Sequence, residues 1–278
     1  DLDQYGKSSQ LRNAMLASSR QSAPLVAAIA TASNSIIVCS IKRTRPGIKT
    51  RNHQSGHAVH IVASDDYDND EISQVKQQQR TTTAVVFSGN KADAILLLKI
   101  MREYGRRIWE RYDSIPSVER VADGLSEALL SFMRYDRESE LHDGTGKVIV
   151  DRDFDMARPF GVQSLVLGVR GGPATIRSVD PSGVQNGWVA RALGKGSDRA
   201  NQMLEGAWKP GLEEGQVRDM CVKILRDLYR EEQEQHVRDD GMAGAGAGAG
   251  EVMIICEIVS SRGFSQESFS LLEKDVEG

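Results

Sequence analysis

The stretch Arg158-Pro159-Phe160-Gly161-Val162 opens the most clearly structured part of the chain, because the apolar run VQSLVLGV starts at its last residue. Two turn signals follow, Gly171-Gly172-Pro173 and then Asp180-Pro181-Ser182-Gly183. In the second turn the proline fixes φ, the aspartate can cap the backbone, and the glycine tolerates a positive φ. We therefore predict a meander of three antiparallel strands, over 162–169, 174–179 and 187–193.

Hydrophobic periodicity predicts helices and strands on both sides of this meander. Upstream we expect a short helix over 10–20, strands over 25–31, 36–41, 56–63 and 82–87, and helices over 91–112 and 117–133. Downstream we expect helices over 197–207 and 212–234, an apolar strand over 252–259, and a short terminal segment over 264–273. Strand-forming segments lie on either side of each helix pair. We therefore predict an α+β fold, a four-layer αββα sandwich of two face-to-face sheets between outer helices.

A length of 278 residues fits one large domain or two small ones. We expect a single domain over 1–278, with a short N-terminal tail and helix over 1–20. Three stretches have too few apolar residues to join the core and are expected to be loop insertions. They lie at about 64–80, 134–157 and 238–250, and the last contains a Gly-Ala tract.

Composition excludes several classes of function. The net charge of −4 gives no electrostatic footprint for nucleic acid or an anionic membrane. No apolar run approaches the ~20 residues that span a bilayer, and the first residues lack the pattern of a signal peptide. The three cysteines Cys39, Cys221 and Cys256 sit in apolar patterns, which indicates buried free thiols in a reducing compartment. We expect a soluble intracellular protein without a cofactor.

No convincing metal or phosphate site is present in the sequence. His53, His57 and His60 cluster, yet 57 and 60 are an odd number of residues apart on a strand and would face opposite sides. The Gly187–Lys195 stretch has the wrong glycine spacing for a phosphate loop, and Gly196 stands where such a loop has serine or threonine. We expect no metal ligand and no catalytic residue of these kinds.

Several motifs together resemble the alpha-type subunits of the 20S proteasome. The family's Arg-Pro-Phe-Gly-Val strand stands at 158–162 and its Asp-Pro-Ser-Gly turn at 180–183. Weaker matches are Phe87-Ser88-Gly89 before a helix with aspartate, and Gly6, Lys7, Gln10 and Ala14 at the opening helix. The residues that carry the resemblance are Gln10, Gly89, Asp93, Arg158, Pro159, Phe160, Gly161, Asp180, Pro181, Gly183, Trp188, Gly194 and Lys195. Among the alpha types the wording of 158–196 looks most like the second.

The resemblance implies a fold and a role. The implied fold is the sandwich of the N-terminal nucleophile hydrolases, in agreement with the layers predicted above. The implied role is a non-catalytic subunit of a seven-membered alpha ring, which contributes to the substrate gate and docks activators in ubiquitin-dependent degradation. The implied partners are other alpha subunits, the beta ring and regulatory particles, in cytoplasm and nucleus.

Two alternatives stay open at this stage. Thr81-Thr82-Thr83 imitates the start of a catalytic subunit, in which a free terminal threonine supplies nucleophile and base. An active version needs a strand hairpin after that threonine, whereas here a helix follows Gly89 and the hairpin lies upstream. We therefore expect Thr81–Thr83 to begin an ordinary strand. The other alternative is a monomeric ligand-binding sandwich, which sizing would reveal at ~30 kDa by the chain mass.

One position of the family's activator pocket differs in this chain. The resemblance implies that a lysine just before the third strand's Ile or Val receives the C-terminal carboxylate of an activator. Alignment of Val59-His60-Ile61 puts His60 at that position. Because histidine is only partly charged near neutral pH, we expect carboxylate binding there to depend on pH.

Overall fold

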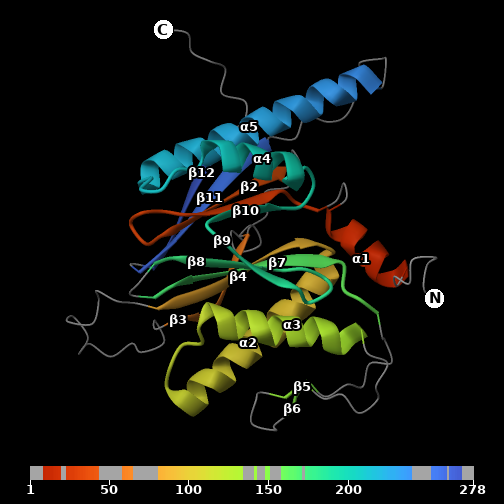
Figure 1. The fold of residues 1–278 in the computed structure, drawn as a ribbon, viewed down its shortest axis with the longest axis vertical. Helices are drawn as coiled ribbons and strands as arrows, with labels where there is room; N and C mark the ends of the chain where they lie inside the picture. Colours follow the sequence, from red (N-terminus) through yellow and green to blue (C-terminus); the bar gives the residue numbers. More distant parts are fainter. Residues whose placement is uncertain are drawn as a thin grey trace, which may run out of the picture.

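The computed structural model describes residues 9–19, 23–43, 58–64, 81–133, 141–142, 148–150, 158–170, 173–239, 252–261 and 263–270. Two five-stranded antiparallel sheets lie one above the other in Figure 1, and a pair of helices covers the outer face of each. In the described part of the chain no helix is long and apolar enough to cross a bilayer.

The first sheet has the order β10-β1-β2-β11-β12. Its strands are β1 (Val26–Ala30), β2 (Ile36–Arg43), β10 (Ala190–Leu193), β11 (Val252–Ser260) and β12 (Gly263–Ser270). The β1–β2 hairpin turns at Asn34, which has a positive φ of 58°. Asparagine tolerates this conformation better than most residues, so the polar link between the two apolar runs forms a tight connection.

The second sheet has the order β3-β4-β7-β8-β9. Its strands are β3 (Val59–Ser64), β4 (Thr82–Gly89), β7 (Val162–Val169), β8 (Thr175–Val179) and β9 (Gln185–Trp188). β3 is therefore an edge strand, and its pairing with β4 shifts register between Ile61 and Ala63. A short two-stranded sheet, β5 (Leu141–His142) with β6 (Val148–Val150), stands apart from both.

The helices form two pairs and one single element. α2 (Lys91–Tyr112) and α3 (Val118–Met133) cover the second sheet, while α4 (Ser197–Ala207) and α5 (Glu214–Asp239) cover the first (Figure 1). The Asn90 side chain caps α2 by accepting from the backbone N–H of Ala92, and the helix ends at Asp113 with φ 47°. The single helix α1 (Ser9–Ser19) packs against β4 and β7.

Three apolar clusters fill the spaces between these layers. Strand residues alternate between them, because successive side chains point to opposite faces of a sheet. In β1, Val26 and Ala28 meet the other sheet, whereas Ala27 and Ile29 meet α4 and α5. Leu165 and Leu167 of β7 likewise face the first sheet, while neighbouring Val162 and Val166 face α2 and α3. The inner strands β1, β2, β4, β7 and β11 are thus largely buried on both faces, which explains their nearly continuous apolar sequences.

The prediction of one continuous third strand in the meander is wrong. The 187–193 segment is divided between the two sheets: β9 pairs with β8, and β10 pairs with β1. The chain bends at Val189, whose carbonyl accepts from the Ala30 backbone N–H. The strand therefore changes partners halfway, and it links one edge of each sheet.

Other boundaries are also corrected. The segment expected at 264–273 contains a strand, β12, which pairs along its whole length with β11. The insertion expected at 134–157 contains β5 and β6, so it is not wholly irregular, and α5 continues to Asp239, inside the insertion expected at 238–250. The insertion at 64–80 lies outside the described residues except for Ser64, which ends β3.

Candidate functional site

The residues Arg158 and Asp93 join the start of β7 to the start of α2. The Arg158 guanidinium donates to the two Asp93 carboxylate oxygens at 2.5 and 2.9 Å, and the Gly161 backbone N–H donates to one of them at 3.1 Å. The hydrogen bond with Asp93 raises the pKa of Arg158. Pro159, between the two donors, contributes a carbonyl 3.4 Å from the same guanidinium. A bidentate pair of this kind fixes geometry as well as charge.

The aromatic ring of Phe160 continues this junction into the core. The Arg158 guanidinium lies over the Phe160 ring at 5.3 Å, and Phe160 stacks on Phe132 of α3 with ring centroids 4.4 Å apart. The Arg-Pro-Phe stretch therefore connects α2, α3 and β7. Its role in this geometry is to hold three elements together.

Two glycines of the signature stand where another element approaches closely. Gly89 has φ 129°, and a Cβ there would lie 2.2 Å from the Gly161 carbonyl oxygen. A Cβ on Gly161 would lie 3.0 Å from the Ala17 Cβ, so α1 is seated directly against this strand start. Gln10 is on the same helix but is exposed, and the described contacts give it no part in the junction.

The Asp180-Pro181-Ser182-Gly183 turn is tied to α3. Asp180 accepts from the backbone N–H groups of Ser182 and Val184 at 2.8 and 3.1 Å, as expected of a capping aspartate. Pro181 is buried, and Gly183 has φ 81°. The Gly183 carbonyl accepts from Ser126 Oγ at 2.5 Å. The turn that links β8 to β9 is thereby fixed against α3.

The last signature residues lie at the end of β9 and in the link from β10 to α4. Trp188 Nε1 donates to Ser178 Oγ at 2.8 Å. Gly194 has φ 97°, and a Cβ there would lie 2.1 Å from the Pro24 carbonyl oxygen. Lys195 forms an ion pair with Glu232 of α5. The signature residues thus stand at several separate junctions, and none of the contacts described for them is that of an active site.

The edge strand β3 carries the predicted pocket residue, His60. The His60 ring is partly exposed and lies 6.5 Å, centroid to centroid, from the Phe87 ring of β4. Just before it, the backbone N–H groups of Ala58 and Val59 both donate to Oε2 of Glu257 at 2.9 Å. Glu257 is fully buried on β11, so one carboxyl oxygen of the first sheet holds the start of β3 in the second. The sequence contained a signal for this contact, a single acidic residue inside the run VMIICEIVS, but the prediction passed over it.

A cavity of about 630 Å³ lies between the far end of β3 and α2. Ile61, Val62 and Ile115 give it apolar walls, and Trp109 of α2, which is 38% exposed, stands at its margin. Arg102 crosses from α2 to donate to the Ile61 carbonyl at 3.2 Å, which satisfies one backbone group of the open strand edge. His60 does not line this cavity. The position predicted to bind a carboxylate is therefore distinct from this cavity on the same strand.

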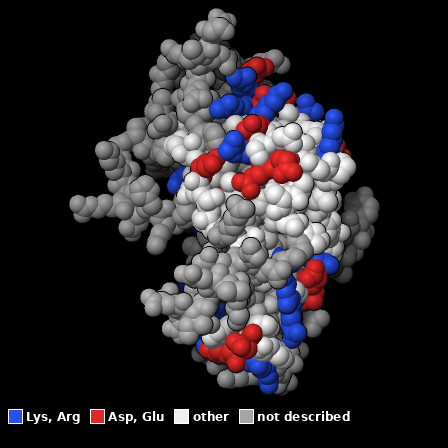
Figure 2. Space-filling model, turned by 90° about the vertical axis from the view of Figure 1, so that its left-hand side faces the viewer, with Lys and Arg blue, Asp and Glu red and all other residues white. Residues whose placement is uncertain are grey.

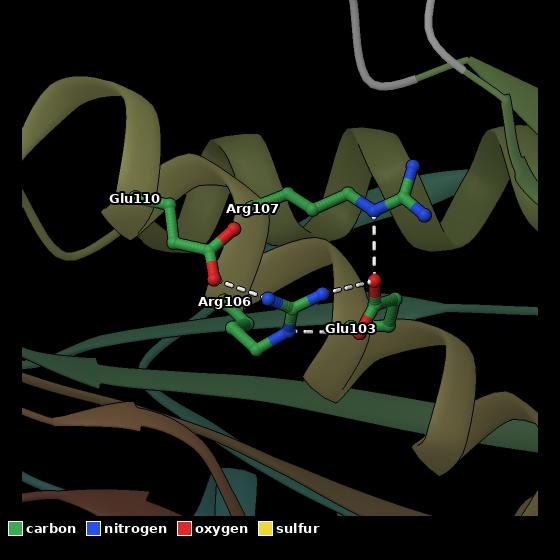
Figure 3. Close-up of polar contacts among 4 residues, drawn as sticks. All are labelled: Glu103, Arg106, Arg107 and Glu110. Atoms are coloured by element: carbon green, nitrogen blue, oxygen red, sulfur yellow. Dashed lines mark hydrogen bonds and ion pairs between the residues drawn. The ribbon is translucent and has the colours of Figure 1, made fainter.

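Four charged residues of α2 form a network beside the cavity (Figure 3). Arg106 lies between Glu103 and Glu110, and Arg107 reaches Glu103 from the other side at 2.8 Å. Hydrogen bonds, from Arg106 above all and also from Arg107, lower the pKa of Glu103 to about 2 against the effect of burial. The Glu103 carboxylate is paired with an arginine on both sides, and its low pKa keeps it ionised near neutral pH.

The threonine stretch has the structure of an ordinary strand start. β4 begins at Thr82, as predicted, and lies between β3 and β7 inside the sheet. Thr82 and Thr83 are buried, and Thr83 Oγ1 donates to the Pro116 carbonyl at 2.8 Å. The β1–β2 hairpin is entered from Ala23, Pro24 and Leu25, which have no nucleophilic side chain.

The surface carries mixed charge. On the face drawn in Figure 2, basic and acidic side chains alternate over both helical layers, and neither sign forms a continuous field. Within the described residues, no group of three histidine, cysteine or acidic side chains is arranged to hold a metal ion. His53 and His57 lie outside the described residues.

Comparison with known proteins gives consistent matches. A family model described as "Proteasome subunit" matches residues 60–237. The chain is 30% identical over 144 residues to proteasome subunit alpha type-5 of Drosophila melanogaster, covering 52% of this chain and 54% of that protein. It is 27% identical over 146 residues to the alpha type-5 subunit of Trypanosoma brucei brucei, covering 52% and 54%. It is also 34% identical over 94 residues to proteasome subunit alpha of Halobacterium salinarum, covering 34% of each.

These alignments span about half the length of the type-5 relatives, and less of the archaeal one. The two eukaryotic proteins named above are type-5 subunits. The second alpha type, which the 158–196 wording suggested, has no support from them.

Proposed function

The chain belongs to the proteasome subunit family as an alpha-type member, and on this premise we propose that it is a non-catalytic subunit of a 20S alpha ring. In that role it would scaffold a ring of seven different subunits, contribute to the substrate entry gate and help to dock activators. Its partners would be other alpha subunits, the beta ring and regulatory particles that act in ubiquitin-dependent degradation. Its location would be cytoplasm and nucleus.

The observation that carries the non-catalytic part of the proposal is that the strand beginning at Thr82 is built into the sheet, with Thr82 and Thr83 buried and Thr81 half-buried. A terminal-threonine hydrolase needs a free amine and an accessible hydroxyl on the same residue. Here Thr82 and Thr83 lie in a strand that is paired on both sides, and the Thr83 hydroxyl donates a hydrogen bond to the Pro116 carbonyl. Cleavage before Thr81 would also separate β1, β2 and β3 from the rest of the covalent chain.

The layered packing supports the fold part of the proposal. Two sheets share one apolar cluster, and each packs its other face on a helix pair. We propose that this arrangement is the αββα sandwich of the N-terminal nucleophile hydrolases. Helix α1 packs at the junction of β4 and β7, where it would face the ring's exterior or a neighbour.

The docking part of the proposal rests on β3. His60 stands next to two backbone groups that a buried carboxyl oxygen fixes, so its backbone position is well defined. A fixed edge strand with a titratable side chain suits recognition of a peptide carboxylate. We propose that His60 takes part in the pocket that receives an activator's C-terminus.

The native mass of the endogenous assembly tests the function directly. A tagged chain purified from its own cells is expected in a particle of hundreds of kilodaltons together with other alpha and beta subunits. A threonine-directed epoxyketone is expected to label the beta subunits of that particle and to leave this chain unlabelled. A ~30 kDa monomer on sizing, by the chain mass, would overturn the ring assignment. Labelling of Thr81, with mass spectrometry showing a chain that starts there, would overturn the non-catalytic assignment.

A further inference from the structure

All three cysteines of the chain meet at one place in the core. Cys39 of β2, Cys256 of β11 and Cys221 of α5 belong to the same apolar cluster, and each is fully buried. The Sγ atoms of Cys39 and Cys256 are 2.7 Å apart. Cys221 is also close enough to affect Cys39, since both other thiols contribute to the raised pKa of Cys39. Three distant parts of the sequence thus bring their thiols together.

The backbone already has the geometry that a bridge between two of them needs. Cys39 and Cys256 are directly opposed in the antiparallel pairing of β2 with β11. Opposed residues in such a pair have Cα atoms ~4.5–5.5 Å apart, inside the ~4.4–6.8 Å that disulfides span. Cys221 lies on the helix that covers this sheet and has no such registered partner. The strand pair therefore favours one of the possible bridges over the others.

We propose that Cys39 and Cys256 form an oxidation site, in which a peroxide converts the two thiols into a cross-strand disulfide while Cys221 stays reduced. One thiol sulfur attacks a peroxide oxygen, the O–O bond breaks, and a sulfenic acid and one water form when the peroxide is hydrogen peroxide. The second thiol then attacks that sulfur, an S–S bond forms, and the hydroxyl leaves with the thiol proton as a second water. Two thiols and one peroxide thus give one disulfide and two waters.

The setting determines how the site behaves. Because the three thiols are fully buried, an oxidant reaches them only when the packing around them opens locally, and a small oxidant such as hydrogen peroxide needs the least opening. The neighbouring thiols and burial raise the pKa of Cys39 well above its ordinary value, which keeps it protonated and slows its reaction. Oxidation at this site is therefore slower than at an exposed thiol. The bond, once formed, would tie β2 to β11 and close a loop between residues 217 positions apart.

The test uses the full chain in its native assembly. The assembly is treated with hydrogen peroxide, the peroxide is quenched, and the chain is then unfolded in denaturant that contains N-ethylmaleimide to alkylate the remaining thiols. The oxidised chain is expected to lose two hydrogen atoms and to take up one maleimide, where the reduced chain takes up three. Digestion without reductant is expected to yield one peptide pair that joins Cys39 to Cys256. The closed loop should also make the denatured chain run faster on a non-reducing gel.

Matched variants separate this bridge from the other possibilities. Cys221→Ser is expected to keep the Cys39–Cys256 link, whereas Cys256→Ser is expected to lose it, with circular dichroism checking that each is folded. If Cys256→Ser does not fold, peptide mapping of the wild type and of Cys221→Ser still shows which two cysteines are linked. The proposal is overturned by a Cys39–Cys221 link as the main product, by loss of the link in Cys221→Ser, or by three alkylated thiols after peroxide doses and times far beyond those that oxidise an exposed thiol.

Discussion

Arg158 and Asp93 are 65 positions apart in sequence and form a bidentate ion pair, with Asp93 almost completely buried and Arg158 half exposed. The Gly161 backbone N–H shares the same carboxylate. A buried charge that loses its partner costs far more than an exposed one, because it has been removed from water without compensation. This asymmetry makes the pair a sharp test of what the Arg-Pro-Phe-Gly stretch does.

We predict that Arg158→Ala lowers the free energy of unfolding by about 3 kcal/mol, since it leaves the Asp93 carboxylate buried without its cation. Arg158→Lys keeps a charge but loses the two-pronged contact, and should cost about 1 kcal/mol. Arg199→Ala is the control, because its pair with Glu231 is exposed on both sides and should cost under ~1 kcal/mol. Urea denaturation of the three variants measures their free energies of unfolding, which should fall most in Arg158→Ala. Equal losses of stability in Arg158→Ala and Arg199→Ala would contradict the prediction.

We predict that Gly194→Ala destabilises the chain by about 3 kcal/mol or more, because the new methyl would meet the Pro24 carbonyl at 2.1 Å in a positive-φ conformation. Gly206→Ala is the matched control. Gly206 lies near the end of α4 with open space around it, so alanine there should be neutral or stabilise by ~0.5 kcal/mol. Thermal melting reports both changes. A Gly194→Ala variant as stable as wild type would show that Pro24 can move away.

Much of the layered fold could be predicted from the sequence, because many helix and strand boundaries are set by a few neighbouring residues. The span of β7 was predicted as found, since Val162 follows a turn-forming stretch and the strand is buried on both faces. The span of α2 was also predicted as found, because its apolar stripe is regular and Asn90 provides an N-cap. Signals of this kind depend on a few neighbouring residues. They do not depend on which strand pairs with the segment in the sheet.

The parts that were missed depend on distant partners. The run QNGWVARAL gives no sign that the strand leaves one sheet at Val189 and joins the other, because that change is set by β1 and β8. β12 looks polar because Ser265–Glu267 on this edge strand are exposed and only its pairing with β11 makes it a strand. Glu257 was passed over because its two donors lie 198 and 199 positions away.

We predict that Glu257→Ala releases the start of β3, because two buried or half-buried backbone N–H groups would lose their common acceptor, at a cost of about 2–4 kcal/mol. Glu257→Gln keeps one side-chain oxygen as acceptor but loses the charge, so it should cost about 1 kcal/mol. Hydrogen exchange at Ala58 and Val59 measures the release locally. Exchange there that stays as slow in Glu257→Ala as in wild type would show that other contacts hold β3.

We predict a small pH-dependent contribution from Glu103, whose pKa is lowered to about 2 by its arginine neighbours. A carboxyl with a depressed pKa stabilises the fold above its ordinary value of ~4.3 and loses that effect as pH falls through about 2. The pair is substantially exposed, so Glu103→Gln should cost under ~1 kcal/mol at pH 7. The difference should shrink toward pH 3 and in 1 M salt. A carboxyl titration midpoint near 4 would contradict the pairing in Figure 3.

The last prediction concerns His60 and the docking role proposed for β3. A histidine with an ordinary pKa of ~6.5 is charged below that pH, and a bound carboxylate raises its pKa further. Affinity for an activator's C-terminal peptide should therefore be highest below the free pKa, and should fall about fivefold as pH rises through the bound pKa, the effect of a ~1 kcal/mol pair. His60→Lys should bind tightly and without this pH dependence up to pH 8, and His60→Ala weakly at every pH. Fluorescence anisotropy of a labelled peptide on the assembled particle measures all three. If wild type and His60→Ala gave the same affinity across the range, His60 would have no part in the pocket, whatever the family to which the chain belongs.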